Sequence, residues 1–282
     1  RVRQGQGGPD PDADRLGVYA KDTKSGEYVS FTGNMSGMLI AEYIIREKKA
    51  GGTLPANSAL VETIVTTDMA KAIAKAYDVK LIEVLTGFKY IGEQIKFFEE
   101  QNSYEYVFGL EESYGCLAGT YARDKDACVA VMMLCEVAAW CKSNNVTLWD
   151  EMISLYEKYG YYKESLETMT LKGMDGAEKI QSMMNEMRNN PPKTIGSWDV
   201  LALRDYMQDT RTEIATGAVT ETGLPNSNVL YYELSDNAWC CVRPSGTEPK
   251  IKFYFGVVGS DIADSEIKLD ELRAAMLAYA GE

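Results

Sequence analysis

Apolar residues recur along the first half of the chain in two alternating patterns, one typical of helices and one of short strands. Helical spacing covers residues 35–49, 67–77, 91–101 and 126–142, and Thr147 with Asp150 predicts the capped start of another helix. Compact apolar runs at 59–65, 79–85 and 104–109 predict buried strands between these helices. This alternation predicts an α/β domain with a mixed, mainly parallel sheet and flanking helices.

The second half of the chain has a different pattern. Strand-like runs cover 161–170, 229–234, 239–242 and 251–258, and Asp236-Asn237 predicts a hairpin turn. Helices are predicted over 177–188, where Asn189-Asn190-Pro191-Pro192 ends the pattern, and over 264–279. We therefore predict that an α+β domain with an antiparallel sheet follows the first domain.

Composition narrows the class of protein. Of the 282 residues 45% are hydrophobic and 25% charged, without an apolar stretch long enough to span a bilayer and without a signal-peptide pattern, so we expect a cytoplasmic protein. The net charge of −13 argues against nucleic acid or an anionic membrane as a partner. None of the six cysteines forms a C-x-x-C motif, and Cys128, Cys135 and Cys141 follow an apolar helical pattern that predicts core packing.

The chain contains no histidine. This excludes a Ser-His-Asp triad and a Cys-His pair, and it argues against a zinc site. Any proton transfer must therefore use carboxylates, lysine, tyrosine or a group outside this chain.

A run near the end of the chain, Arg243-Pro-Ser-Gly-Thr-Glu-Pro-Lys250, has the composition of a phosphate-binding loop. The guanidinium of Arg243 can meet two phosphate oxygens at once, and Ser245 and Thr247 add hydroxyl donors. Gly246 allows successive N–H groups to face one anion, and Lys250 adds a point charge. Because strands are predicted on both sides, the run is not a Walker loop, although a polar surface turn remains the alternative.

Three aspartates alternate near the start of the chain, in Asp10-Pro-Asp-Ala-Asp-Arg15. In a tight loop Asp10, Asp12 and Asp14 would point the same way and offer oxygen ligands to Mg²⁺, with Arg15 beside them to hold a phosphate. An acidic turn is the alternative; an EF-hand is excluded because Lys21 stands at the twelfth position. The glycine-rich residues before this loop predict a flexible end.

Two further loops follow predicted strands. In residues 86–93 a phosphate or sugar could sit at a helix N-terminus beside Lys89. In residues 111–115 Glu111 and Ser113 would offer an acceptor and a donor to vicinal sugar hydroxyls. Local evidence alone equally allows an ordinary loop at the first site and a solvated acidic turn at the second.

Taken in their order along the chain, the four motifs resemble the α-D-phosphohexomutase family of phosphoglucomutases and phosphomannomutases. The resemblance covers nearly the whole chain from Asp10 onward, and residues 109–115 are most similar to the phosphoglucomutase and phosphopentomutase branch. It implies a four-domain protein in which residues 1–25 are a remnant of the second domain, 26–160 the third domain and 161–282 the fourth domain.

The resemblance also implies the role of each motif. Asp10, Asp12 and Asp14 would bind Mg²⁺, which touches a phosphoserine, and Arg15 would lie beside that phosphoserine. Lys89, Glu111 and Ser113 would contact the sugar. Residues Arg243, Ser245, Gly246 and Thr247 would clamp the phosphate that is not transferred. The implied activity is an isomerase that interconverts glucose 1-phosphate and glucose 6-phosphate, with glucose 1,6-bisphosphate as intermediate and activator.

The sequence departs from the family in one respect that matters for catalysis. The phosphoserine loop, which reads Thr/Ser-Ala-Ser-His-Asn-Pro in the family, is absent, as is the apolar strand that precedes the metal loop. We therefore expect a carboxy-terminal piece that needs the missing amino-terminal domains as partners and is inactive alone, and the aspartate loop is expected to be disordered and free of metal. The alternatives are a phosphomannomutase, a phosphopentomutase, or a non-catalytic module that binds phosphosugars.

Overall fold

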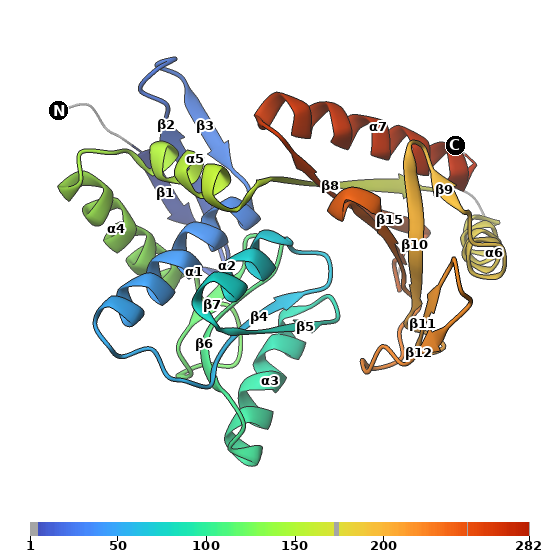
Figure 1. The fold of residues 1–282 in the computed structure, drawn as a ribbon, viewed down its shortest axis with the longest axis horizontal. Coiled ribbons are helices and arrows are strands. Elements are labelled where there is room, and N and C mark those ends of the chain that lie inside the picture. Colours follow the sequence, from blue (N-terminus) through green and yellow to red (C-terminus); the bar gives the residue numbers. More distant parts are fainter. Residues whose placement is uncertain (1–4, 172–174, 247, 282) are drawn as a thin grey trace. The chain divides into compact units, whose positions relative to one another are not determined.

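The computed structural model describes residues 5–171, 175–246 and 248–281. The chain divides into two compact units, Arg1–Gly160 and Tyr161–Glu282. Figure 1 shows their elements, and each unit is described by itself below.

The first unit is built on a four-stranded sheet in the order β5-β4-β6-β7. Its strands are β4 (Ser58–Thr63), β5 (Lys80–Val84), β6 (Glu105–Leu110) and β7 (Cys116–Ala118). Strand β4 runs parallel to β5 and β6, whereas β7 runs antiparallel to β6. All six residues of β4 are buried, as expected for the centre of a sheet between two layers of helices. The predicted mixed, mainly parallel sheet is confirmed.

Five helices accompany this sheet: α1 (Gly33–Ala50), α2 (Met69–Tyr77), α3 (Phe88–Gln101), α4 (Ala127–Ser143) and α5 (Leu148–Tyr159). Side-chain caps fix three of their starts, and at α1 the Thr32 hydroxyl accepts the Met35 N–H at 3.2 Å. Asp126 accepts hydrogen bonds from the first turn of α4, and Thr147 and Asp150 form the predicted capping box of α5.

A small antiparallel sheet, β1-β2-β3, precedes these helices. It consists of β1 (Gly5–Pro9), β2 (Leu16–Lys21) and β3 (Tyr28–Phe31). The expectation of a flexible glycine-rich start is wrong for residues 5–9, which pair along their whole length with β2. Because strands pair through backbone groups, a glycine-rich segment can be held by a partner strand whose own residues Leu16, Val18 and Ala20 are buried.

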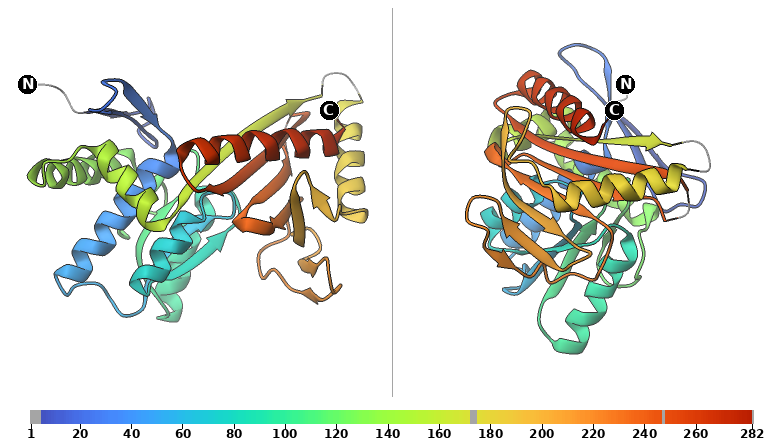
Figure 2. Two further views of the ribbon diagram at one scale, coloured as in Figure 1. Left: turned by 45° about the horizontal axis from the view of Figure 1, so that its top comes forward. Right: turned by 90° about the vertical axis from the view of Figure 1, so that its right-hand side faces the viewer.

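The second unit is an antiparallel sheet in the order β12-β11-β10-β13-β14-β15-β8, and β9 pairs with β10. Its strands are β8 (Tyr161–Thr170), β9 (Thr194–Ile195), β10 (Trp198–Asp205), β11 (Thr210–Glu213), β12 (Val219–Thr220), β13 (Leu230–Leu234), β14 (Trp239–Pro244) and β15 (Lys250–Gly259). Helices α6 (Gly176–Asn189) and α7 (Ile262–Ala280) pack against one face of the sheet, and Met184, Phe253 and Leu272 lie in the core between them (Figure 2). The predicted α+β fold is confirmed.

The predicted burial of two cysteines is wrong. Cys141 is buried in the first unit, but Cys128 and Cys135 are exposed on α4, because that helix turns only one side toward its neighbours. No single helix in the described ranges is long and apolar enough to cross a membrane. Helices α4 and α5 reach the necessary length and hydropathy only when they are taken together, and the pair is bent by 89°. Both helices contact α1.

Glu62 is a buried carboxyl group in the central strand of the first unit. Only 2% of it is exposed, and it lies opposite Glu83 on β5. Its carboxylate accepts a hydrogen bond from the Thr67 N–H at 3.2 Å. Burial, followed by repulsion from Glu83 and Asp68, raises the pKa of Glu62 well above its usual value. The stability that the neutral Glu62 carboxyl contributes is therefore fully present below the pKa of this group in the unfolded chain. It is lost as the pH rises through the pKa of Glu62 in the folded protein.

We expect Glu62→Gln to stabilise the protein at neutral and alkaline pH. The amide keeps an oxygen for the Thr67 N–H but cannot ionise, so the free energy of unfolding should rise by about 1–3 kcal/mol, a gain that shrinks toward acid pH. Urea unfolding across a pH series measures this difference. Glu105→Gln, at the exposed start of β6, is the control. Parallel pH profiles for wild type and Glu62→Gln would contradict the prediction.

Candidate functional site

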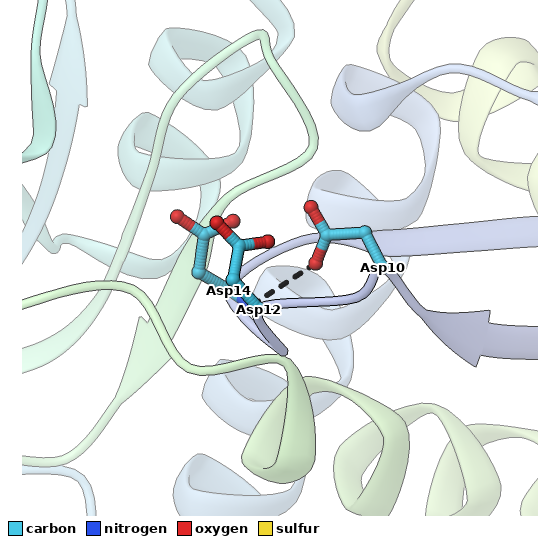
Figure 3. A group of neighbouring side chains, drawn as sticks. All are labelled: Asp10, Asp12 and Asp14. Atoms are coloured by element: carbon cyan, nitrogen blue, oxygen red, sulfur yellow. Dashed lines mark hydrogen bonds between the residues drawn. The ribbon is translucent and has the colours of Figure 1, made fainter.

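The three aspartates near the start of the chain converge on the loop between β1 and β2. One carboxylate oxygen from each of Asp10, Asp12 and Asp14 lies within 4.8 Å of the others. Figure 3 shows the three side chains on the same side of the loop. Three oxygen donors at this separation can bind a single hard divalent cation such as Mg²⁺.

Hydrogen bonds from backbone N–H groups to the Asp10 carboxylate order this loop. Asp10 Oδ1 accepts the N–H groups of Asp14 at 3.1 Å and Arg15 at 3.0 Å, and Ala13 adopts a left-handed conformation at φ 58°. Desolvation opposes ionisation of Asp10, but the N–H groups of Arg15 and Asp14 outweigh it and lower the pKa of this carboxyl. The expectation of a disordered loop is wrong. That expectation rested on the missing apolar strand before the loop, but hydrogen bonds within the loop hold its conformation.

A carboxylate oxygen that accepts no hydrogen bond also makes the loop suited to a cation. Asp14 Oδ1 is buried and accepts no hydrogen bond among the described residues, and Arg15 Nε lies 3.8 Å from it. A buried carboxylate oxygen without a partner is costly unless a cation approaches it. We find Arg15 half-exposed beside the aspartates, where an anion could reach it.

The predicted sugar loop follows β6 in the same unit. Glu111 is buried at 6% exposure, and Ser113 Oγ donates to Glu111 Oε1 at 2.9 Å. The loop presses against the start of α1, where a Cβ on Gly33 would lie 2.4 Å from the Glu112 carbonyl oxygen. A side chain at position 33 would therefore displace the loop, which explains why a glycine stands there.

Lys125 is a functional residue that sequence reasoning missed. Its ammonium lies 3.0 Å from Asp14 Oδ2, 3.9 Å from Glu111 Oε1 and 3.7 Å from Asp124 Oδ1. Burial opposes its charge, but these carboxylates outweigh that effect and raise the pKa of Lys125. The sequence offered one indication of this role: Lys125 directly precedes Asp126, the predicted start of a helix. A residue at that position faces the same loops as the helix N-terminus.

Two backbone hydrogen bonds join the aspartate loop to its surroundings. The Leu16 N–H donates to the Tyr114 carbonyl at 3.1 Å, and the Ala127 N–H at the start of α4 donates to the Ala13 carbonyl at 3.0 Å. The structure thus brings the predicted metal loop and the predicted sugar loop together within one unit.

Lys89 lies apart from this cluster. It is exposed in the first turn of α3, and its ammonium lies over the Tyr90 ring at 4.7 Å. The described part of the chain shows no hydrogen bond or ion pair between Lys89 and residues 111–115. Both segments nevertheless follow the carboxyl ends of parallel strands, the edge at which α/β sheets present ligand sites.

The predicted phosphate loop joins β14 to β15 in the second unit. Arg243 is half-buried at the end of β14, and its guanidinium contacts the Tyr254 hydroxyl at 3.4 Å. It forms no ion pair with a carboxylate in the described residues. Lys250, by contrast, pairs with Glu248 at 3.0 Å. The loop is closed by the Ser245 N–H, which donates to the Lys250 carbonyl at 2.7 Å.

Gly246 is exposed at the tip of this loop, and a Cβ built there would meet no atom within 4 Å. Its φ lies outside the left-handed region, so the backbone does not require a glycine at this position. What the glycine leaves is open space in front of the loop, which a ligand can enter. Thr247 lies outside the described residues.

Comparisons with known proteins show which proteins this chain resembles. Residues 32–159 match the family described as phosphoglucomutase/phosphomannomutase, alpha/beta/alpha domain III. Over 263 residues, 93% of the chain, the sequence is 34% identical to a phosphoglucomutase of Staphylococcus aureus strain MRSA252. Residues 32–159 thus carry domain III of the phosphoglucomutase/phosphomannomutase family, and the chain resembles this family over nearly its whole length. It spans 46% of the length of that relative.

Solved structures of phosphohexomutases share the fold of this chain. Parafusin, a phosphoglucomutase from Paramecium, matches 99% of the chain with a TM-score of 0.63 and 18% identity, and the match covers 46% of parafusin. The N-acetylphosphoglucosamine mutase of Aspergillus fumigatus, in complex with GlcNAc-6P and magnesium, matches 98% with a TM-score of 0.54 and 12% identity, covering 49% of that enzyme. Another structure of that mutase contains glucose 1,6-bisphosphate and has a TM-score of 0.51.

We expect Lys125→Met to loosen the contact between the two loops of this phosphohexomutase unit. The methionine keeps the aliphatic volume but removes the cation between Asp14 and Glu111, so hydrogen exchange of the Leu16 and Ala127 amides should accelerate by about tenfold. Amide exchange followed by mass spectrometry or NMR measures this change. Lys142→Met, at the exposed end of α4, is the matched control. Unchanged exchange at both amides would show that Lys125 does not hold the loops together.

Proposed function

We propose that this chain recognises phosphosugars: the loop at Glu111 in the first unit is suited to sugar hydroxyls, and the loop at Arg243 in the second unit is suited to a phosphate. The observation that carries the proposal is the state of Arg243. In a chain of net charge −13 this guanidinium has no carboxylate partner among the described residues. An arginine kept free of acidic side chains in an acidic protein is suited to bind an anionic ligand.

We further propose that the longer protein containing this chain is a phosphoglucomutase. It would interconvert glucose 1-phosphate and glucose 6-phosphate through a phosphoserine and a glucose 1,6-bisphosphate intermediate. The name of the Staphylococcus aureus relative supports this substrate, and the bisphosphate in the Aspergillus fumigatus structure supports the intermediate. Because this chain has no histidine and no Ser-His-Asn-Pro run, we propose that it is inactive alone. Mannose or pentose phosphates are the alternative substrates.

Each loop has a task that follows from its chemistry. The Glu111 carboxylate accepts from one sugar hydroxyl, and the Ser113 hydroxyl can turn from Glu111 Oε1 to donate to the neighbouring sugar hydroxyl. Arg243, Ser245 and the N–H groups around Gly246 hold the phosphate that is not transferred, together with Thr247. Since the two phosphates of the intermediate exchange roles, this site must accept the ligand in two orientations, and recognition of a dianion by charge allows both.

The aspartate loop fits a magnesium ion, in keeping with the magnesium in the Aspergillus fumigatus complex. Asp10, Asp12 and Asp14 would hold it, and a bound Mg²⁺ would neutralise charge on a phosphoryl oxygen. Arg15 lies at the rim of this loop, where its guanidinium can contact the phosphoserine of a neighbouring domain.

We expect Arg243→Ala to weaken the binding of glucose 6-phosphate to the chain. One bidentate charged contact contributes roughly 1.5–3 kcal/mol, so affinity should fall about 10- to 150-fold. Isothermal titration calorimetry measures the change. Arg273→Ala, which removes an exposed arginine of α7 in the same unit, is the control. Equal affinities of wild type and Arg243→Ala would sink the assignment of this loop.

We expect the purified chain to show no sustained conversion of glucose 1-phosphate to glucose 6-phosphate in the presence of Mg²⁺ and glucose 1,6-bisphosphate, because the phosphoserine is missing. A coupled assay that detects glucose 6-phosphate measures turnover. The longer protein that contains a Ser-His-Asn-Pro loop is the positive control, and its rates with glucose, mannose and pentose phosphates would identify the substrate. Turnover by the chain alone, or a longer protein that binds phosphosugars without converting them, would refute the proposed mechanism.

A further inference from the structure

A cavity of about 310 Å³ lies in the second unit, at the place where α6 stops covering the sheet. Its lining residues come from the end of α6 and the residues after it, from β10 and β11, and from the residues that follow each of these strands; they include Arg188, Leu203, Asp205, Thr210, Thr212 and Ile214. Helix α6 ends at Asn189, and the prolines at 191 and 192 cannot continue it. The sheet face beyond the helix therefore stays open.

The floor of the cavity consists of two cross-strand pairs. Leu203 lies opposite Thr212, and Asp205 lies opposite Thr210, so all four side chains share one face of the β10-β11 hairpin. The hydroxyls of Thr210 and Thr212 form no side-chain hydrogen bond with the described residues. The floor thus combines apolar surface from Leu203 and Ile214 with two hydroxyls that are available to a ligand.

The wall of the cavity is a buried ion pair. Arg188 and Asp205 have side chains only 7% and 5% exposed, and Arg188 Nε donates to Asp205 Oδ2 at 2.8 Å. Arg188 also donates to Asn228 Oδ1 at 2.7 Å and to the Met184 carbonyl at 3.5 Å. A guanidinium has five N–H groups, so two of them stay without a partner in the described structure.

The charge of the site excludes a phosphate-binding role. Arg188 and Asp205 cancel each other, and the lining contains no other charged side chain. The cavity also adjoins the C-terminal end of α6, where the helix carries partial negative charge that disfavours anions. This separates its chemistry from that of the loop at Arg243.

We propose that this cavity binds a neutral polyhydroxy molecule, a monosaccharide or a polyol of similar size. Several hydroxyls on one ligand match a lining of guanidinium, carboxylate, amide and hydroxyl groups, which supplies donors and acceptors side by side. The C–H face of a sugar ring suits the apolar floor at Leu203 and Ile214. The volume lies at the lower end of ligand sites, about 300–1,000 Å³, and fits one ring rather than an oligosaccharide.

The test uses the whole chain with methyl-labelled isoleucine and leucine, and D-glucose and D-sorbitol as probes. At least one of them should shift the methyl signals of Leu203 and Ile214 saturably at millimolar concentrations. Thr212→Val keeps the β-branched shape but removes a hydroxyl, so it should weaken this binding about three- to tenfold. Thr168→Val, at an exposed position of β8 in the same sheet, is the matched control and should bind as wild type does. If Thr212→Val does not fold, Gln208→Ala at the exposed rim replaces it with the same expectation.

Three results would overturn the proposal. The first is the absence of any saturable shift with glucose or sorbitol, which would mean that the cavity holds only solvent. The second is wild-type affinity in the Thr212→Val or Gln208→Ala protein. The third is tighter binding of glucose 6-phosphate than of glucose at these same methyl groups, which would make the cavity an anion site.

Discussion

The ammonium of Lys125 stands among carboxylates that would otherwise repel one another. It lies close to Asp14 on the aspartate loop and to Glu111 on the loop after β6, and its charge allows the two acidic loops to remain in contact. Without such a cation, carboxylates gathered in one small volume would favour an open arrangement. Lys125 therefore favours contact between the aspartate loop and the loop at Glu111.

Backbone groups make that electrostatic arrangement specific. The hydrogen bonds from Leu16 to Tyr114 and from Ala127 to Ala13 set the register of the aspartate loop against its neighbours. Gly33 then lets α1 start directly against the loop at Glu112. Charge attraction alone is not directional, so it is these short contacts that determine where each carboxylate points.

The two units handle charge in opposite ways. The first gathers acidic groups that are suited to a cation and to sugar hydroxyls, whereas the second presents Arg243 without an acidic partner in the described residues. In a strongly acidic chain this separation matters, because an arginine paired with a carboxylate is a poor receptor for phosphate. Arg188 in the same unit, which is buried against Asp205, illustrates the paired and electrically neutral alternative.

Sequence alone determined the helices, the strands β4, β5, β6, β8, β13, β14 and β15, and the chemical type of each loop. Periodicity and caps are local properties, so Thr147 with Asp150 placed the start of α5, and the run 161–170 coincides with β8. Strand β10 and several short strands escaped prediction. All four residues of β11 are polar, and this strand is held by its pairing with β10 and β12. Likewise, only the tertiary structure put Lys125 beside Asp14 and left the cavity beyond the end of α6. Hydrogen bonds and ion pairs act over a few ångströms in space. The number of residues between two positions does not tell how far apart they lie in the folded protein.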